Sequence, residues 1–118
     1  LTGPQISAYQ DLVRRVPVAD NVMEYAVKLA RTTRPHSPGT PKFIKDWVRW
    51  GAGPRASQYL ILGAKTRALL TGRHTPDIDD VRALAGPTLR HRLVTNVNAE
   101  ADGVTTIEIV ERLVRENS

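Results

Sequence analysis

A chain of 118 residues has room for one hydrophobic core, and its lack of cysteine excludes disulfide scaffolds, thiolate metal sites and a cysteine nucleophile. Lysine and arginine number 17 against 12 aspartates and glutamates, so the net charge of +5 favours an anionic partner. No apolar run approaches the roughly eighteen residues of a membrane span and no signal-peptide pattern opens the sequence, so we expect a cytoplasmic protein without a membrane partner.

Two amphipathic helices are predicted in the first third of the chain. Thr2 with Gln5 three residues later has the pattern of a capping box, and the first helix should end before Pro17, because the residue before a proline avoids the helical conformation. The second helix should have Asp20 and Glu24 near its start and basic residues toward its end, as the helix dipole favours. We interpret its closing basic residues as structural: Lys28, Arg31 and Arg34. The apolar faces comprise Ile6, Tyr9, Val13 and Val16, then Val22, Ala26, Leu29 and Ala30.

The next two segments differ sharply in composition. Residues 35–42 hold three prolines and one glycine, which predicts an exposed loop. Residues 43–50 contain the only phenylalanine and both tryptophans of the chain, and core packing is the ordinary use of such side chains. The pattern of residues 43–50 is compatible with an extended segment or with a helical turn.

Residues 50–57 read WGAGPRAS and introduce the longest predicted helix. Gly51 and Gly53 loosen the backbone, and Pro54 suits the first turn of a helix because its missing N–H would have no partner there. Arg55 is then expected in the opening turn, where unpaired N–H groups make the helix end partly positive. An arginine at such a place either turns into water at little cost or faces an anion such as a phosphate.

The helix predicted over 55–71 carries apolar residues almost all round, so we expect it to be central and covered on several sides. Gly63 would allow another helix to approach closely, and Gly72 is expected to end the helix. No acidic residue occurs between Asp46 and Asp77, which indicates either a solvated basic face or a surface for a phosphate-bearing partner. The basic residues of this run include Arg49, Arg55, Lys65, Arg67 and Arg73.

A fourth helix should begin at Asp77, an N-cap with Asp80 three residues later, and we interpret the aspartates here as caps rather than as an acid–base pair. Gly86 and Pro87 are expected to break the chain, and a short helix should follow over 87–93. Three basic residues cluster in that short helix: Arg90, His91 and Arg92. They either approach phosphate or a neighbouring subunit, or simply close a helix.

The last part of the chain is predicted to hold a polar loop over 95–103 and one more helix. Thr105 and Glu108 form a capping-box pattern at the start of that helix. Its expected buried stripe is Ile107, Val110, Leu113 and Val114. Together these patterns predict an all-α bundle of about five helices, forming a single domain over residues 1–118.

Several of these stretches resemble, in the same order, the C-terminal lid domain of MoxR-type AAA+ ATPases. WGAGPRA at 50–56 resembles the GxPR "sensor 2" element of that lid, which commonly reads WGASPRA, so Gly53 stands where a serine is usual. VPVADNVMEYAVKLARTTRP at 16–35 resembles the second helix of the lid, which typically ends in a Thr-Arg pair. LRHRL at 89–93 resembles the family's LRHRI, whereas DIDDV at 77–81 departs from its usual TPEDV by losing the proline.

The resemblance covers nearly the whole chain and carries functional implications. It implies that the chain is one piece of a longer ATPase, which agrees with a sequence whose only methionine is Met23. It further implies that Arg55, presented by Gly53 and Pro54, reaches the γ-phosphate of ATP held with Mg²⁺ by a core domain of the same polypeptide. Membership would also bring a hexameric ring, chaperone-like maturation of client complexes, and von Willebrand factor A-domain partners.

Several chemistries lack their residues in this sequence. There is no GxxxxGK[ST] phosphate loop and no apolar strand ending in paired acids for Mg²⁺, so the chain is not expected to hydrolyse ATP by itself. No serine lies in a GxSxG setting, and the three histidines lie far apart, which predicts no metal site. The alternative function is a small basic helical module that binds nucleic acid. Against it, the most basic helix is too apolar to lie in a groove.

Overall fold

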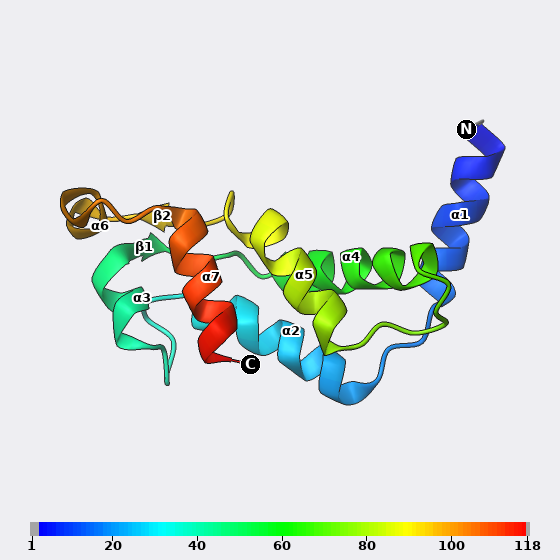
Figure 1. Cartoon of the computed structure of the whole chain (residues 1–118), viewed down its shortest axis with the longest axis horizontal. Coiled ribbons are helices and arrows are strands. Elements are labelled where there is room, and N and C mark those ends of the chain that lie inside the picture. The colour runs from blue at the N-terminus through cyan, green and yellow to red at the C-terminus, as the bar shows by residue number, and fades with distance from the viewer. Residues whose placement is uncertain (1–2, 118) are drawn as a thin grey trace.

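The computed structural model describes residues 3–117, apart from the side chains of Ile6 and Tyr9. Over this range the chain forms seven helices and one two-stranded antiparallel sheet (Figure 1). The elements are α1 (Gly3–Arg15), α2 (Asp20–Thr32), α3 (Lys42–Trp47), β1 (Val48–Trp50), α4 (Ala56–Leu70), α5 (Ile78–Leu89), β2 (Val94–Thr95), α6 (Val97–Asp102) and α7 (Thr106–Glu116). The all-α class is confirmed, because 65% of the residues are helical. None of the described helices has the length and apolar character needed to cross a membrane.

Helix α4 is central, as predicted. It packs against α5, α2 and α1, while α7 closes over α5 and α2 (Figure 1). A Cβ added at Gly63 would lie 2.9 Å from Cγ and Cδ1 of Leu84 on α5, so the predicted close approach of a second helix is confirmed. Helix α1 projects from one end of the molecule, and α6 lies at the other end (Figure 1).

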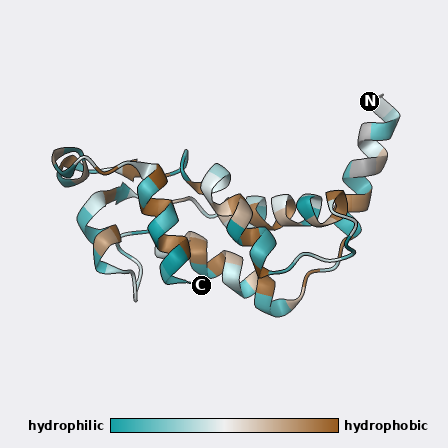
Figure 2. Cartoon of the chain, viewed as in Figure 1, coloured by the Kyte–Doolittle hydropathy of each residue, from teal (hydrophilic) through white to brown (hydrophobic). Residues whose placement is uncertain are grey.

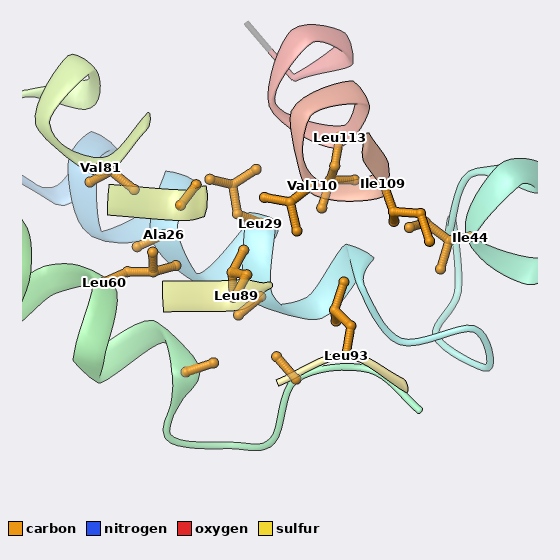
Figure 3. Packing of buried hydrophobic residues seen from close by; sticks show 14 of the residues in the cluster. Ala26, Leu29, Ile44, Leu60, Val81, Leu89, Leu93, Ile109, Val110 and Leu113 are labelled. Atoms are coloured by element: carbon orange, nitrogen blue, oxygen red, sulfur yellow. The ribbon is translucent and has the colours of Figure 1, made fainter. Parts of the chain in front are cut away.

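One hydrophobic cluster joins the helices. Leu29 of α2, Leu60 of α4 and Leu89 of α5 are fully buried, and Figure 3 shows their side chains converging with those of α7. Apolar and polar residues alternate along α2 and α7 (Figure 2), as expected of helices that bury one face. Burial of apolar area is therefore the main stabilising contribution.

The helix ends largely follow the predicted signals. Asp77 and Asp80 form a complete capping box at the start of α5, and Gly72, in the left-handed region with φ 77°, follows the end of α4. The Thr105 hydroxyl accepts a hydrogen bond from the Glu108 N–H at 3.3 Å. Helix α1 ends before Pro17 as predicted, whereas the predicted capping box of its first turn involves Thr2, which lies outside the described residues.

The predicted stripe of α7 is partly wrong. Ile109 is buried together with Val110 and Leu113, whereas Ile107 is 48% exposed and Val114 is half-buried. Residues 109, 110 and 113 share one helical face, and position 107 is rotated away from it. The core thus uses a slightly different face from the one predicted.

Residues 43–50 combine the two conformations that the sequence left open. Helix α3 ends at Trp47 and the chain continues directly into β1. Phe43 is buried and packs against the half-buried Trp47 with ring centroids 6.3 Å apart, but Trp50 is 61% exposed. Core packing is therefore confirmed for two of the three aromatic residues.

The predicted break at Gly86 and Pro87 is wrong. Helix α5 continues through both residues to Leu89, and residues 90–92 form a turn instead of a separate helix. The missing N–H of Pro87 costs one hydrogen bond close to the end of the helix. Ala85 and Leu89, on either side of Pro87, are fully buried, so core packing keeps the helix continuous.

The predicted polar loop over 95–103 is also wrong. Thr95 belongs to β2, which pairs with β1, and α6 follows with Asn96 as its N-cap and Gly103 as a left-handed C-cap. The Asn96 side chain donates a hydrogen bond to the Asp46 carbonyl at 2.8 Å, and the Trp47 indole N–H donates to Asp102 at 3.0 Å. These contacts, between residues about fifty positions apart, order the segment, so that α6 forms in place of the predicted loop. With α3 and α6 the described residues form seven helices, against the predicted number of about five.

Candidate functional site

The segment 51–55, which the sequence singled out, leaves the end of β1 and enters α4. Its first residues lie directly on the end of α2. A Cβ added at Gly51 would lie only 2.5 Å from the Thr33 carbonyl oxygen, so no larger residue fits there without displacing backbone. The Ala52 N–H donates to the Thr33 hydroxyl at 2.9 Å, and that hydroxyl donates to the Ala30 carbonyl at 2.6 Å.

Arg34 holds the same segment from the other side of its backbone. Its Nε donates to the Ala52 carbonyl at 2.9 Å, and its Nη2 donates to the Gly53 carbonyl at 3.3 Å. The Arg34 carbonyl in turn accepts a hydrogen bond from Thr40 at 2.8 Å. The structural interpretation of Arg34 is confirmed, although hydrogen bonding to loop carbonyls, rather than the helix dipole, explains it.

Arg55 lies one residue earlier relative to α4 than predicted. It is the N-cap residue, with φ −86° and ψ −4°, and Pro54 lies in the turn before the helix rather than in its first turn. Helix α4 begins at Ala56 because the Ala56 N–H already bonds the Gly53 carbonyl across that turn, at 3.1 Å. The Arg55 side chain is exposed, and within residues 3–117 it makes no hydrogen bond or ion pair. At Gly53 an added Cβ would meet nothing within 4 Å, so the serine usual in the resembling motif would fit.

Pairing of the two strands brings a second arginine to Arg55. Trp50 of β1 faces Val94 of β2 in an antiparallel register, so the residues after Trp50 run beside those before Val94. A hollow of about 470 Å³ lies here, and Arg92 contributes to its lining. It is lined by Gly53, Pro54, Arg55, Ala56, Tyr59 and Arg92. No carboxylate lines it, so the hollow suits an anion.

The three residues of the predicted basic cluster have different surroundings in the structure: Arg90, His91 and Arg92. The Arg92 guanidinium lies over the Tyr59 ring, 4.6 Å from its centroid, and Nη1 donates to the Thr88 carbonyl at 2.6 Å. Arg90 instead donates from Nε to His91 at 3.3 Å, and neither residue lines the hollow. Only Arg92 of the three is brought to Arg55.

Sequence reasoning missed a second charged centre at Asp80, beyond its role as a cap. The side chain is fully buried, and Arg73 binds it with two hydrogen bonds, one of them from Nη1 at 2.7 Å, while Arg67 donates at 2.6 Å. Burial raises the pKa of Asp80, but hydrogen bonds from Arg73, the Asp77 N–H and Arg67 outweigh it and hold the pKa well below its ordinary value. The sequence held one signal of this centre: Arg67 and Arg73 lie in a stretch without acidic residues. A partly buried arginine needs an anion, which must then come from elsewhere in the chain.

This centre changes the interpretation of the basic run. Arg67 and Arg73 are both paired with Asp80, and Arg73 also with Asp77, so we do not assign them to a phosphate-binding surface. Helix α4 is packed on three neighbours, which leaves it unable to enter a nucleic-acid groove. His36, His74 and His91 are exposed as predicted, and no group of three metal-ligating residues occurs in the part of the chain that the structure describes.

The fold and the site define a class of protein. The family model of the AAA lid domain matches residues 43–113, more than half of the sequence. The chain belongs to this family.

Similar proteins narrow the class. The chain is 32% identical to Chaperone MoxR1 of Mycobacterium tuberculosis over 94% of its length, and 31% identical to the YeaC protein of Bacillus subtilis over 86%. A crystal structure of a candidate ATPase from Cytophaga hutchinsonii superposes with a TM-score of 0.82 at 27% identity over 89% of the chain. The resemblance to the lid of MoxR-family AAA+ ATPases is thereby confirmed. The chain spans only 31%, 29% and 32% of these three proteins, about a third of each.

Proposed function

We propose that this lid closes over ATP bound by a separate AAA+ core domain, and that Arg55 meets the γ-phosphate in the closed state. The observation that carries the proposal is an exposed guanidinium without a partner, beside a hollow that no carboxylate lines. A cation at the positive end of a helix is slightly destabilising unless an anion faces it. The terminal phosphate of ATP would supply that anion.

The anchoring of residues 51–53 supports a sensing role. Thr33 and Arg34 fix the backbone of the segment on the end of α2, which is itself part of the hydrophobic cluster. A contact between Arg55 and phosphate would therefore pull on the whole bundle rather than on a loose loop. Closure and opening of the lid would then report whether the nucleotide retains its γ-phosphate.

The wider role follows from the same family. We propose that the core domain belongs to the same polypeptide, that it holds ATP and Mg²⁺, and that lid movement couples hydrolysis to neighbouring subunits of a hexameric ring. Chaperone-like maturation of client complexes agrees with the name of the mycobacterial relative. Von Willebrand factor A-domain partners and a cytoplasmic location stay predictions. A nucleic-acid-binding module is not supported by the packing of α4.

Steady-state kinetics of the full-length ATPase test the proposal. Arg55→Ala should lower kcat for ATP hydrolysis by about ten-fold or more, because a donor that stabilises charge on the transferred phosphoryl group is lost. Arg31→Ala, which removes an exposed arginine from the last turn of α2, is the matched control and should retain wild-type kinetics. An Arg55→Ala enzyme as active as the control would refute the sensing role.

A further inference from the structure

The hollow beside Arg55 contains a second guanidinium whose position is already fixed. Tyr59 follows Arg55 by four residues, so the two side chains are neighbours on the same face of the start of α4. The Arg92 guanidinium stacks on the Tyr59 ring, with 4.6 Å to its centroid, while Arg92 Nη1 is held by the Thr88 carbonyl. Arg92 thus lines the hollow from the turn after α5, whereas Arg55 lines it from the start of α4.

A second pair of arginines, at Asp80, has a different environment. Arg67 and Arg73 share the buried carboxylate of Asp80, which compensates their mutual repulsion. Arg55 and Arg92 line one hollow without any carboxylate. An anion bound in this hollow would lie beside both side chains, and phosphate matches the planar donor geometry of a guanidinium.

We propose that Arg92, positioned by Tyr59, is a second phosphate-binding residue of the lid, and that Arg55 and Arg92 together hold the terminal phosphate of a nucleoside triphosphate. This inference rests on the proposed function of Arg55. Two arginines on one terminal phosphate make the lid selective for the triphosphate over the diphosphate, because the diphosphate lacks the phosphate that both arginines bind. The ring of Tyr59 limits the freedom of Arg92, so less conformational entropy is lost on binding.

Nucleotide affinity of the full-length ATPase tests the inference by calorimetry with ATPγS and with ADP, both in the presence of Mg²⁺. Arg92→Ala should raise the Kd for ATPγS by about ten-fold or more, as expected for loss of a charged hydrogen bond, and leave the Kd for ADP within about two-fold. Arg92→Lys should lie between, because it keeps the charge and loses the planar fork. Arg31→Ala should change neither Kd.

Variants of Tyr59 test the positioning role. Tyr59→Phe keeps the ring beneath the guanidinium and should bind ATPγS like the wild type. Tyr59→Leu removes the ring and should weaken ATPγS binding by about three- to ten-fold without affecting ADP. Equal effects of Tyr59→Leu on the two nucleotides would overturn the positioning role.

The remaining outcomes separate the two proposals. If Arg55→Ala weakens ATPγS binding and Arg92→Ala does not, the inference about Arg92 is overturned and the sensing role of Arg55 stands. If neither variant affects ATPγS binding, both proposals fail. If Arg92→Ala changes only the oligomeric mass measured by light scattering, Arg92 is a contact between subunits and the inference is overturned.

Discussion

Arg55 is exposed at the positive end of α4 and has no partner within residues 3–117, which sets an expectation for stability. In the 118-residue chain, Arg55→Ala should leave the free energy of unfolding unchanged or raise it by less than about 1 kcal/mol, because a charge that opposes the helix dipole is removed. Urea denaturation of the two proteins measures the difference. A loss of several kcal/mol would mean that Arg55 has a structural partner, and the sensing role would lose its main support.

Asp80 should behave in the opposite way. Asp80→Asn removes the anion that Arg67 and Arg73 share and leaves Arg73 with its pair to the exposed Asp77. Because both arginines are more than one-third exposed to water, the expected loss is at the lower end for a buried ion pair, about 3 kcal/mol. Asp79→Asn is the control, since Asp79 is 76% exposed and pairs only with Arg82, on the surface. Its effect on denaturation should be under about 0.5 kcal/mol.

The same residue predicts a pH dependence. The pKa of Asp80 is lower in the folded chain than its ordinary value of 3.8, so its contribution to stability is complete above that value and is lost as the pH falls below it. The free energy of unfolding of the wild type should therefore fall more steeply below about pH 4 than that of Asp80→Asn. Parallel slopes of the two proteins in acid denaturation would contradict the ion-pair assignment.

At the residue scale, the roles of some side chains could be predicted from the sequence and the roles of others could not. Arg55 stood out because a glycine-proline turn precedes it, and Asp77 because N-caps have a local signal. From the sequence, Arg92 is only one of three basic residues and Asp80 only part of a cap, because their partners lie in other elements: Tyr59 for the first and two arginines for the second. Spacing along the chain carries no information about such partners.

At the scale of elements, two glycines of one segment make opposite predictions. Gly51→Ala places a Cβ 2.5 Å from the Thr33 carbonyl oxygen and 2.6 Å from the Arg34 Cα, both backbone atoms, so the segment must move and lose its hydrogen bonds to α2. The 118-residue chain should lose about 2 kcal/mol or more. Gly53→Ala, the matched control, meets nothing within 4 Å and should change stability by less than about 0.5 kcal/mol.

Thermal and urea denaturation of both variants give the result. If Gly51→Ala were as stable as Gly53→Ala, the segment would not be anchored on α2 as described. Residues 51–53 would then not connect Arg55 rigidly to the helical bundle.

Long helices with clear periodicity or caps were the predictable elements. Helix α2 follows from its apolar spacing, α4 from its long apolar run between Pro54 and Gly72, and the start of α5 from its capping box. Helix α6 and the two strands are short, and long-range contacts such as those of Trp47 and Asn96 hold them. The continuation of α5 through Pro87 likewise depends on burial of its neighbours, which overrides the local preference of proline.

For the whole molecule, the arrangement joins the candidate site to the core in two ways. Residues 51–53 are fixed on α2, and pairing of β1 with β2 brings the turn after α5 against the start of α4 (Figure 1). Both α2 and α5 contribute to the single hydrophobic cluster. A force on the two arginines would thereby be transmitted to most of the lid, as the proposed coupling of nucleotide state to ring movement requires.

The central claim is that Arg55 meets the γ-phosphate of ATP in the closed state. The most direct measurement is a structure of the full-length ATPase with a non-hydrolysable ATP analogue, compared with its ADP complex. We predict that the Arg55 guanidinium lies within hydrogen-bond distance of the γ-phosphate, about 3 Å, in the first and has no phosphate partner in the second. A guanidinium that remains in solvent beside a bound ATP analogue, with the lid closed, would contradict the claim.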